Sequence, residues 1–393
     1  MEQIIPIELY IHIPFCVQKC AYCDFLSAPA DEQTKNRYIG ALLREIRMHE
    51  AELGRRRVAT IYIGGGTPSA LAPEYIELII KQLRISFDVM EDAEITIECN
   101  PGTLDEQKLL SYRNVGINRL SLGLQSTFDE ELKVLGRIHT YEAFLHNYEL
   151  ARKCGFHNIN VDLMSALPYQ SCEKFLKSLE RLVQLKPEHI SAYSLIIEKG
   201  TAFYERYKFD AVRRDAGQAT EVLPSEEVEY EIYKKTQLYL KEHGYTHYEI
   251  SNYARPGYES RHNSGYWKRT EYLGIGLGAA SLLANVRYTN EQDLKAYIEK
   301  TKQISTEELY AVVEKIERRA QMEEFMFLGL RMMQGITRAE FRDTFGVEIE
   351  AVYGEVLRSL KDEGLLELRA GRIYLTEKGT DISNYTLSKF LFD

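Results

Sequence analysis

The sequence has no excess of positive charge. Its 393 residues include 49 lysines and arginines against 59 aspartates and glutamates, which gives a net charge of -10 at pH 7. Proteins that coat nucleic acid or lie on anionic membranes carry a broadly basic surface, so this balance excludes both classes as general functions. Only a local basic patch stays compatible with the composition.

Long hydrophobic runs are also absent. No stretch reaches about 18 consecutive apolar residues, the length that a membrane-spanning helix requires. The first residues, MEQIIPIELYIHIP, have neither the basic start nor the long apolar core of a signal peptide. We therefore expect a cytoplasmic protein. Internal repeats and low-complexity segments are lacking as well, while 45% hydrophobic residues are enough for a substantial core.

Cysteine is scarce, and its distribution excludes a secreted disulfide framework. The chain has six cysteines, and three of them, Cys16, Cys20 and Cys23, fall within eight residues. Disulfide-rich secreted domains are short and spread pairable cysteines along the chain. A tight group of thiols in a large protein indicates metal binding in a reducing compartment instead. The scattered cysteines are expected to be ordinary buried or half-buried residues: Cys99, Cys154 and Cys172.

Short β-rich segments recur along the first half of the chain, and helix-like segments separate them. The β-rich runs are ELYIHIP, TIYIGGG, EITIECNP, RLSLGLQS, NINVDLMSALP and HISAYSLIIE, at 8–14, 60–66, 94–101, 119–126, 158–168 and 189–198. Helical spacing of apolar residues is found between them in Tyr38–Leu53, Pro73–Phe87 and Phe175–Leu185. Alternating strands and helices form βαβ units with a parallel sheet. The sequence thus predicts the α/β class, with six units in a partial (β/α)6 barrel whose functional residues lie at the C-terminal strand ends.

The alternating pattern ends near Thr201. A long helical stretch, Ser225–His243, leads to a strand-like run at 245–254 and a loop-like segment at Arg255–Ser264. The pattern then becomes helical from about Ser305 and ends in a hairpin, which is the outline of a winged helix. We expect three parts: a barrel over 1–205, a central α+β extension over 206–304 and a winged-helix-like module over 305–393.

The spacing of the clustered cysteines suits an iron–sulfur cluster. CVQKCAYC places thiols at positions i, i+4 and i+7, directly after the first expected strand. A cubane cluster normally takes one cysteine per iron, and this segment supplies three, so one iron is left open for an exchangeable ligand. Zinc is the alternative metal, but a tetrahedral zinc site requires a fourth Cys or His nearby. The nearest candidate is His12, on the expected strand.

Cys-x3-Cys-x2-Cys with an aromatic residue before the last cysteine resembles the signature of the radical-SAM superfamily. The surrounding text, YIHIPFCVQKCAYCDF, is similar to one branch, the oxygen-independent coproporphyrinogen III oxidases and their relatives, the HemW-type heme chaperones. The similarity continues through GGGTPS, IECNPGT, GLQS, LGRIHT, DLMSALP and HNSGYW, so it covers most of the chain. The resemblance implies a [4Fe-4S] cluster on the three cysteines and S-adenosylmethionine on the open iron. In that superfamily, electron transfer into the sulfonium can give a 5′-deoxyadenosyl radical.

The same resemblance implies which residues contact S-adenosylmethionine. Gly65, Gly66 and Thr67 end the second expected strand, where glycines let the backbone approach a ligand closely. Arg137 is informative because its planar guanidinium fork suits a carboxylate. The full set of matched positions is Tyr10, Tyr22, Gly65, Gly66, Thr67, Glu98, Gln125, Arg137, Asp162 and Ile196.

Three features favour the chaperones over the oxidases within this branch. The oxidases carry a further cysteine two residues after the cluster motif, whereas this chain has Phe25, as the chaperones do. The oxidases also have an extension before the cluster strand, and this chain reaches that strand early. The third feature is HNSGYW, which resembles the heme-associated HNxxYW motif of the chaperones. The resemblance implies that His262 ligates heme iron or lies near it, with Tyr266 and Trp267 against the porphyrin face.

We therefore expect a heme chaperone that binds heme, the cluster and S-adenosylmethionine and passes heme to an acceptor protein. The alternative is an oxygen-independent coproporphyrinogen III oxidase. Other expected partners are an electron donor such as a flavodoxin or a ferredoxin, and a second copy of the chain. Nucleic acid is not expected, because residues 306–393 show no basic stripe.

Three positions depart from the usual pattern of this branch. Ser165 and Ala166 stand where its members usually have Tyr and Gly, and Ala280 stands where many have His. The last change removes a second histidine from the region of the heme motif. It therefore argues against ligation of heme by two histidines.

Overall fold

The computed structural model describes residues 5–303 and 305–392. The first half of the chain alternates strands with helices, as the sequence predicts. Its elements are β1 (Ile7–Ile13), α1 (Glu32–Leu53), β2 (Arg57–Gly65), the short 3-10 helix η1 (Pro68–Ala70), α2 (Pro73–Ser86), β3 (Asp88–Cys99), α3 (Glu106–Asn114), β4 (Arg119–Gln125), α4 (Asp129–Leu135), α5 (Tyr141–Lys153), β5 (Ile159–Ser165), α6 (Cys172–Gln184) and β6 (His189–Ser194).

The second half of the chain extends this sheet and then forms a separate lobe. The extension contains α7 (Ala202–Asp215), α8 (Glu226–Glu242), β7 (Thr246–Glu249), β8 (Asn252–Ala254), α9 (Arg261–Trp267), β9 (Tyr272–Ile275), β10 (Ala280–Leu283), β11 (Val286–Asn290), α10 (Leu294–Lys300), the 3-10 helix η2 (Thr306–Leu309) and β12 (Tyr310–Lys315). The lobe contains α11 (Arg318–Gly329), β13 (Ile336–Thr337), α12 (Arg338–Phe345), α13 (Ile349–Asp362), β14 (Leu366–Arg369), β15 (Arg372–Leu375), α14 (Glu377–Asp381) and α15 (Ser383–Ser388).

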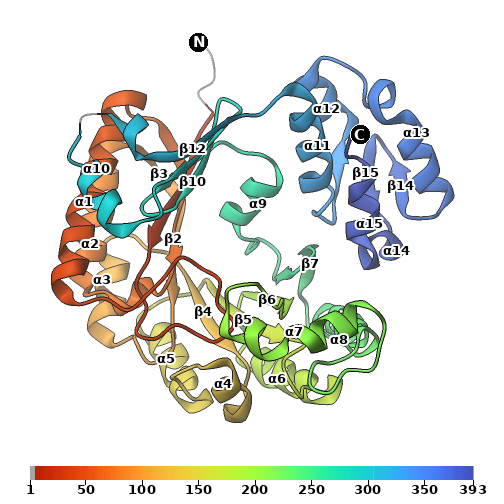
Figure 1. Ribbon diagram of the computed structural model, residues 1–393, viewed down its shortest axis with the longest axis horizontal. Helices are drawn as coiled ribbons and strands as arrows, with labels where there is room; N and C mark the ends of the chain where they lie inside the picture. Colours follow the sequence, from red (N-terminus) through yellow and green to blue (C-terminus); the bar gives the residue numbers. More distant parts are fainter. Residues whose placement is uncertain (1–4, 304, 393) are drawn as a thin grey trace.

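Strands β1 to β6 lie side by side in chain order, and each neighbouring pair is parallel. They form a curved wall with α1 to α6 on its outer side (Figure 1). This arrangement confirms the predicted α/β fold with a partial barrel. The helices begin where the sequence offers a cap: the Asp31 carboxylate, for example, accepts the Thr34 backbone N–H at 2.8 Å and starts α1.

The two faces of the barrel strands differ in polarity. Side chains alternate along a strand, so Leu9 and Ile11 of β1 pack into the core beneath the helices, and Glu8, Tyr10 and His12 face the barrel interior. Parallel registers carry this pattern from strand to strand. The interior row is Glu8, Tyr10, His12, Thr60, Tyr62, Glu94, Thr96, Glu98, Arg119, Ser121, Asn160, Asp162 and Ser191. Full parallel barrels fill their interior with branched apolar residues. Because the inward side chains here are mostly polar, this barrel encloses a polar chamber instead.

Further strands lengthen the sheet at both edges. On one side, β9 pairs in parallel with β1, and β10, β11 and β12 follow in antiparallel order. On the other side, β8 pairs antiparallel with β6, and β7 lies beyond it. The strand-like run predicted at 245–254 is therefore a hairpin of two strands. The loop predicted at Arg255–Ser264 is only partly a loop, because the Ser260 hydroxyl caps α9 from Arg261 onward.

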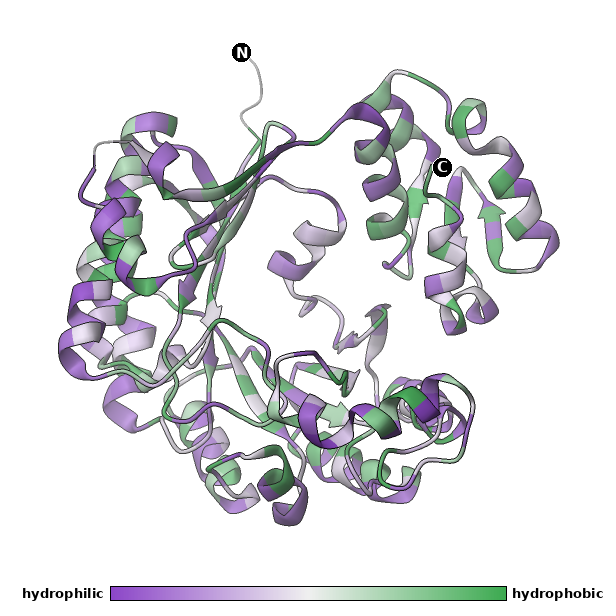
Figure 2. Cartoon of the chain, viewed as in Figure 1, coloured by the Kyte–Doolittle hydropathy of each residue, from purple (hydrophilic) through white to green (hydrophobic). Residues whose placement is uncertain are grey.

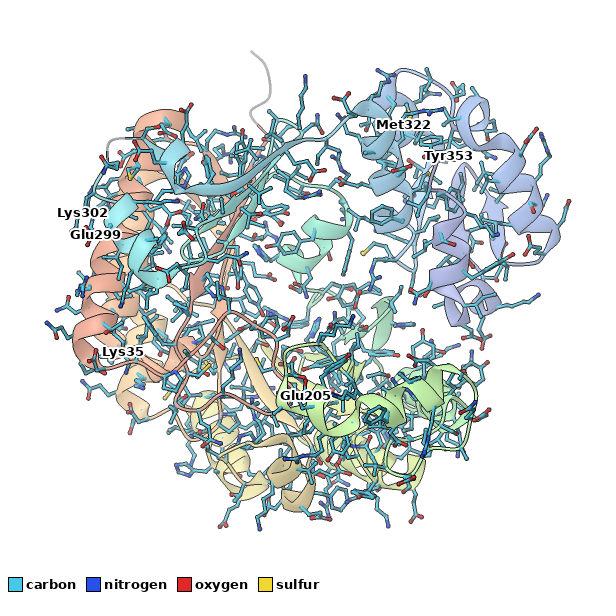
Figure 3. All side chains as sticks on the ribbon, viewed as in Figure 1. Lys35, Glu205, Glu299, Lys302, Met322 and Tyr353 are labelled. Atoms are coloured by element: carbon cyan, nitrogen blue, oxygen red, sulfur yellow. The ribbon has the colours of Figure 1, made fainter. Side chains whose placement is uncertain are left out.

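The C-terminal lobe has its own hydrophobic core, around residues such as Met326, Phe341 and Leu357. Helices α11 to α13 pack on the three-stranded sheet β13-β15-β14, which gives the expected winged-helix outline (Figure 1). Figure 3 places Met322 and Tyr353, two members of that core, inside this lobe. Strand β12 pairs with β11 in the large sheet, so the chain leaves that sheet after Lys315. The domain boundaries at 205/206 and 304/305 stay predictions.

Helices throughout the described chain carry both hydrophilic and hydrophobic residues, as the mixed colours of Figure 2 show. Among residues 5–303 and 305–392, no helix has the length and apolar character needed to cross a membrane.

Ser165 and Ala166, two of the residues that differ from the usual pattern of this branch, lie at the end of β5 and directly after it. The Ser165 hydroxyl lies 3.1 Å from the Ser194 hydroxyl at the end of the neighbouring strand. Ala166 has a φ of 57°, in the left-handed region that costs a residue with a Cβ roughly 1–2 kcal/mol. This backbone conformation explains why glycine is usual at the position, and it leaves Ala166 strained.

Candidate functional site

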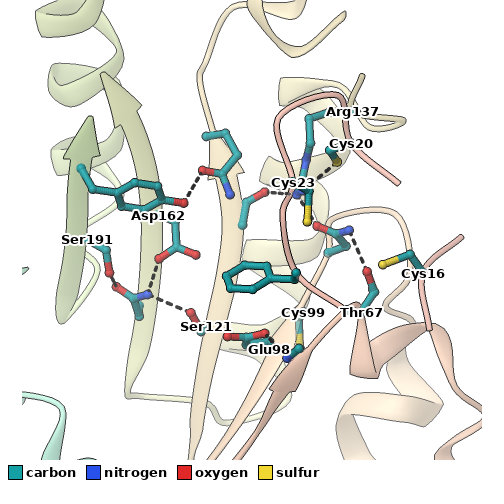
Figure 4. A pocket seen from close by; sticks show the side chains of 18 of the residues that line it. Cys16, Cys20, Cys23, Thr67, Glu98, Cys99, Ser121, Arg137, Asp162 and Ser191 are labelled. Atoms are coloured by element: carbon teal, nitrogen blue, oxygen red, sulfur yellow. Dashed lines mark hydrogen bonds between the residues drawn. The ribbon is translucent and has the colours of Figure 1, made fainter. Parts of the chain in front are cut away.

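A pocket of about 340 Å³ opens at the C-terminal ends of the barrel strands and continues into the polar chamber. The thiols of Cys16, Cys20 and Cys23 line it together with side chains from β2, β3, β4 and β5 (Figure 4). The six cysteines are all free thiols, and these three are half-buried. Functional residues therefore gather at the strand ends, as the barrel fold predicts.

Backbone hydrogen bonds fix the cysteine loop over this pocket. The Cys16 N–H donates to the Ala28 carbonyl at 3.2 Å, and the Ala28 N–H donates back to Pro14 at 3.0 Å. The Ala21 N–H donates to the Leu135 carbonyl at the end of α4 at 3.0 Å. The loop is thus tied at both ends, so its three thiols stay on the pocket side.

The donor set fits a cubane cluster with one open iron. Cys99 also lines the pocket, but its buried sulfur contacts the Ile97 carbonyl at 3.7 Å and burial strongly raises its thiol pKa. Burial also raises the pKa of Cys23, and bonding to metal would remove that proton. Within the described ranges, no three His, Cys, Asp or Glu side chains converge on a point as ligands of a single zinc ion do. Cluster ligands lie farther apart, because each binds a different iron.

Glycines at the end of β2 let the strand pass directly beneath the cysteine loop. A Cβ on Gly66 would lie 2.6 Å from the Phe15 carbonyl oxygen and 3.0 Å from the Cys16 sulfur. Gly65 has a φ of 111°, a conformation that side chains rarely allow. The Gly65 N–H donates to Glu98 at 3.1 Å, and this bond ties the end of β2 to the end of β3. The close approach of the cysteine loop therefore requires glycine here, and the contact of this backbone with a cofactor stays a prediction.

Arg137 links the cysteine loop to the ends of β3 and β4. Its Nη1 lies 3.7 Å from the Cys20 sulfur, and its Nη2 donates to the Asn100 side chain and to the Gly123 carbonyl. The side chain is half-buried and lines the pocket (Figure 4). A cation in this position lowers the cost of negative charge on nearby thiolates and on a bound carboxylate.

Two buried carboxyls face the pocket from adjacent strands. Burial raises the pKa of Glu98 to about 7, against the opposing hydrogen bonds from the Tyr62 hydroxyl at 2.8 Å and the Gly65 N–H. Burial also raises the pKa of Asp162, whose Oδ1 accepts from the Asn160 amide at 2.7 Å. Glu98 can therefore exchange a proton near neutral pH, and both carboxyls can accept hydrogen bonds from a polar ligand.

The structure brings most of the predicted cofactor residues together. Those that line the pocket are Tyr22, Gly65, Gly66, Thr67, Glu98, Gln125, Arg137 and Asp162. Tyr10 does not line it, because its hydroxyl pairs with His12 Nδ1 at 3.0 Å and its ring stacks near Tyr62. Ile196 also lies outside the lining and is exposed. Their roles stay predictions.

Sequence reasoning missed many of the lining residues, on the chamber walls and at the strand ends. These residues are Tyr62, Asn100, Arg119, Ser121, Gly123, Asn160, Ser191, Tyr193, Ser251, Asn252 and Asn263. The signal that could have found many of them is the polar alternation in runs such as RLSLGLQS and NINVDLMS. A barrel strand whose inner positions are polar indicates a chamber rather than a packed interior.

The HNSGYW motif forms α9, and His262 of that helix is a core residue. His262 is 1% exposed, its Nδ1 lies 2.7 Å from the Thr60 hydroxyl, and its Nε2 lies 3.1 Å from the Tyr266 hydroxyl. Burial and then the charge of Arg119 lower its pKa to about 3, so the ring is neutral. The Trp267 ring is covered by the Arg331 guanidinium, 4.4 Å from its centroid. In this arrangement neither side chain is free to meet a heme.

Glu8 of β1 lies beside α9, and the burial of its carboxyl affects the stability of the fold. Its side chain is buried against α9, where a Cβ on Gly265 would lie only 2.0 Å from Oε1. Among the described residues its Oε2 has no hydrogen-bond partner and lies 3.9 Å from His262 Nδ1. Burial, and next the charge of Glu94, raise the pKa of Glu8 to about 9. The carboxyl is therefore protonated at neutral pH.

Glu8→Gln is expected to raise the free energy of unfolding at pH 8. The folded-state pKa of Glu8 lies above the ordinary value, so stability is lost as pH rises from about 4.5 toward 9. The amide removes this loss, by on the order of a few kcal/mol at pH 8 and by little at pH 5. Anaerobic urea unfolding at both pH values measures the difference. A gain that is equal at both pH values would contradict it, and exposed Glu242→Gln is the matched control.

Comparison with known proteins gives one consistent picture. Residues 10–182 match the Radical SAM superfamily, and residues 316–382 match the HemN C-terminal domain. The heme chaperone HemW of Lactococcus lactis subsp. lactis is 37% identical over 391 residues, covering 99% of this chain and 98% of that protein. The heme chaperone HemW of Bacillus subtilis is 35% identical, with coverage of 97% and 98%.

A solved structure has the same fold over almost the whole chain. Coproporphyrinogen III oxidase (HemN) from Escherichia coli, described as a radical SAM enzyme, superposes with a TM-score of 0.82 at 26% identity. The match covers 98% of this chain and 90% of that one. The branch expected from the cysteine motif is thus confirmed.

Proposed function

Because the chain belongs to the heme chaperone HemW family of radical SAM proteins, we propose that it binds heme and transfers it to an acceptor protein. Full-length similarity to several proteins of that name supports this function over that of an oxidase. The residue that carries the choice is Phe25, at the position where the oxidases have a further cysteine. Phe25 lines the pocket mouth and is 66% exposed, and it offers no ligand to a metal or substrate.

The proposal includes a [4Fe-4S] cluster held by Cys16, Cys20 and Cys23, with S-adenosylmethionine beside it. Such a cluster supplies one-electron reduction of the bound cofactor. The chain's own residues orient that cofactor. Thr67 and Arg137, which both bond the Asn100 side chain, would contact it beside the cysteine loop, and the Glu98 and Asp162 carboxyls would accept its polar hydrogens.

The proposal also covers partners and compartment. An electron donor such as a flavodoxin or a ferredoxin would reduce the cluster, and the acceptor protein would receive heme. Strand β12 lies at the edge of the large sheet with Val312 and Val313 exposed, which is an edge open to pairing in a homodimer. A cytoplasmic setting keeps the cluster thiols reduced.

The proposed heme site is the HNSGYW segment, which forms α9. His262, Tyr266 and Trp267 stay the candidates from the motif, yet His262 uses both ring nitrogens inside the core. Ligation of iron by His262 therefore requires α9 to move, so that a ring nitrogen gives up its bond to Thr60 or to Tyr266. With Ala280 in strand β10, no second histidine stands at the position where many members of the branch have one.

Heme titration of the anaerobically reconstituted protein tests the function. We expect binding of about one heme per chain with a Soret band. If α9 supplies the ligand, His262→Ala lowers heme affinity at least tenfold and shifts the Soret band. If His262 is only a core residue, the variant unfolds at lower urea concentration and its heme spectrum is unchanged. Absence of heme binding by the wild type would contradict the proposed function.

A further inference from the structure

Arg119 begins β4, and its buried cation makes no direct ion pair with the described residues. Its side chain is 2% exposed, and it lines the chamber that continues from the cluster pocket. Its Nε is a buried donor without an acceptor, and its guanidinium makes no ion pair with any residue in the described ranges. A buried, unpaired guanidinium is costly, so native proteins normally give it a partner.

The carboxylates nearest in the chamber are committed elsewhere. Asp162 accepts from Asn160, and Glu98 accepts from the Tyr62 hydroxyl and the Gly65 N–H. Glu94 accepts the backbone N–H groups of Arg261 and His262 at the start of α9. Burial raises the pKa of Asp162 and the charge of Arg119 opposes that rise, but none of these three carboxylates forms a direct ion pair with Arg119.

Neutral hydrogen-bonding side chains share the chamber lining with Arg119. The Asn160 amide donates to the Ser121 hydroxyl at 2.8 Å, and the Ser191 hydroxyl donates to Asn160 Oδ1 at 3.1 Å. Asn252 and Asn263 complete this part of the lining, from β8 and from the HNSGYW helix. Such a wall can hold a polar ligand in place, and it contributes no competing charge.

Arg119 and its neighbours in the lining form the chamber floor, at the opposite end of β4 from the cluster cysteines. Arg119 starts β4 and Gln125 ends it, so their backbones are separated by roughly 20 Å at about 3.3 Å per residue. The cysteines, Thr67 and Arg137 all belong to the upper end (Figure 4). The cofactor assigned to the upper end therefore leaves Arg119 unmatched.

We propose that the chamber floor binds a small carboxylate on Arg119. A guanidinium fork pairs with a planar carboxylate through two parallel hydrogen bonds. One cation neutralises one carboxylate, whereas a phosphate dianion would leave negative charge buried beside Asp162 and Glu98. This inference goes beyond heme transfer and stands or falls independently of it.

Calorimetric titration of the reconstituted full-length protein with sodium propionate tests the site. We expect saturable binding of one propionate per chain, and at least tenfold weaker binding of inorganic phosphate. Arg119→Met should lower propionate affinity tenfold or more, and Arg119→Lys, which keeps the charge and loses the fork, should fall between. The matched control is Arg113→Met on α3, an exposed arginine whose loss should leave propionate binding unchanged.

Stability gives a second measurement that needs no ligand. Because Arg119→Met removes an unpaired buried cation, its melting temperature without propionate should equal or exceed that of the wild type. Equal propionate binding by wild type and Arg119→Met, tighter binding of phosphate, or a lower melting temperature of ligand-free Arg119→Met would each overturn the proposal.

Heme itself carries propionate groups, so a further titration identifies the source of the carboxylate. Competition between heme and propionate that is lost with heme dimethyl ester assigns the carboxylate to heme. Propionate binding that heme leaves unchanged assigns it to a separate small molecule. Both results require Arg119-dependent propionate binding, and its absence overturns the site whatever heme does.

Discussion

Cys20→Ala is expected to abolish the iron–sulfur absorbance of the anaerobically reconstituted protein. The wild type should hold about four irons and four sulfides, one cubane per chain. Cys20 is one of three thiols tied over the pocket by the loop's backbone bonds, and it is the one nearest Arg137. Loss of one of three ligands leaves two irons without protein ligands, so the cluster should not persist.

Iron and sulfide analysis with matched cysteine variants makes this result specific. Cys154→Ala and Cys172→Ala remove thiols that lie outside the pocket, and both should retain a full cluster. Cys99→Ala should retain it too, although Cys99 lines the same pocket, because its sulfur is buried at the end of β3. A full cluster in Cys20→Ala would refute the assignment, and zinc without sulfide in the wild type would support the alternative metal.

Arg137→Ala is expected to weaken S-adenosylmethionine binding and to leave the iron content unchanged. The variant removes a cation that faces the pocket and leaves the Asn100 side chain and the Gly123 carbonyl without their donor. Loss of such a contact costs roughly 1–3 kcal/mol, or about 5- to 150-fold in affinity. Asp162→Ala should show the same pattern from the other side of the pocket.

The EPR spectrum of the reduced cluster measures this binding, because a new ligand on the open iron alters the signal. The spectrum of the wild type should change with added S-adenosylmethionine, and Arg137→Ala should require a higher concentration. Arg181→Ala is the control, since Arg181 packs on Phe128 away from the pocket. A wild-type spectrum that stays unchanged at saturating cofactor would contradict an open iron.

Local sequence signals predicted the barrel well, for a physical reason. Strands such as 119–125 combine an apolar outer side with a short length, and glycines or polar residues mark their ends. These signals are local, so they can be recognised in the sequence without knowledge of the tertiary fold. The cysteine spacing is equally local, and the structure keeps all three thiols on one pocket.

Features set by distant contacts could not be predicted in this way. The run at 245–254 contains residues that suit one strand. Its turn around Glu249–Asn252 depends on pairing with β6 and on hydrogen bonds that the Ser251 N–H and the Asn252 amide donate to the Glu249 carboxylate. The burial of His262 depends on Thr60, which lies about two hundred positions earlier in the chain. The HNSGYW motif alone therefore suggests that His262 is free to ligate heme iron, whereas the fold buries it in the core.

The coproporphyrinogen III turnover of the heme-binding sample tests the central claim most directly. As a heme chaperone with Phe25 at the pocket mouth, the reconstituted protein should bind heme and form no protoporphyrinogen IX above background. Conversion of coproporphyrinogen III at enzyme-like rates, with stoichiometric 5′-deoxyadenosine and carbon dioxide, would contradict the chaperone and establish the oxidase instead.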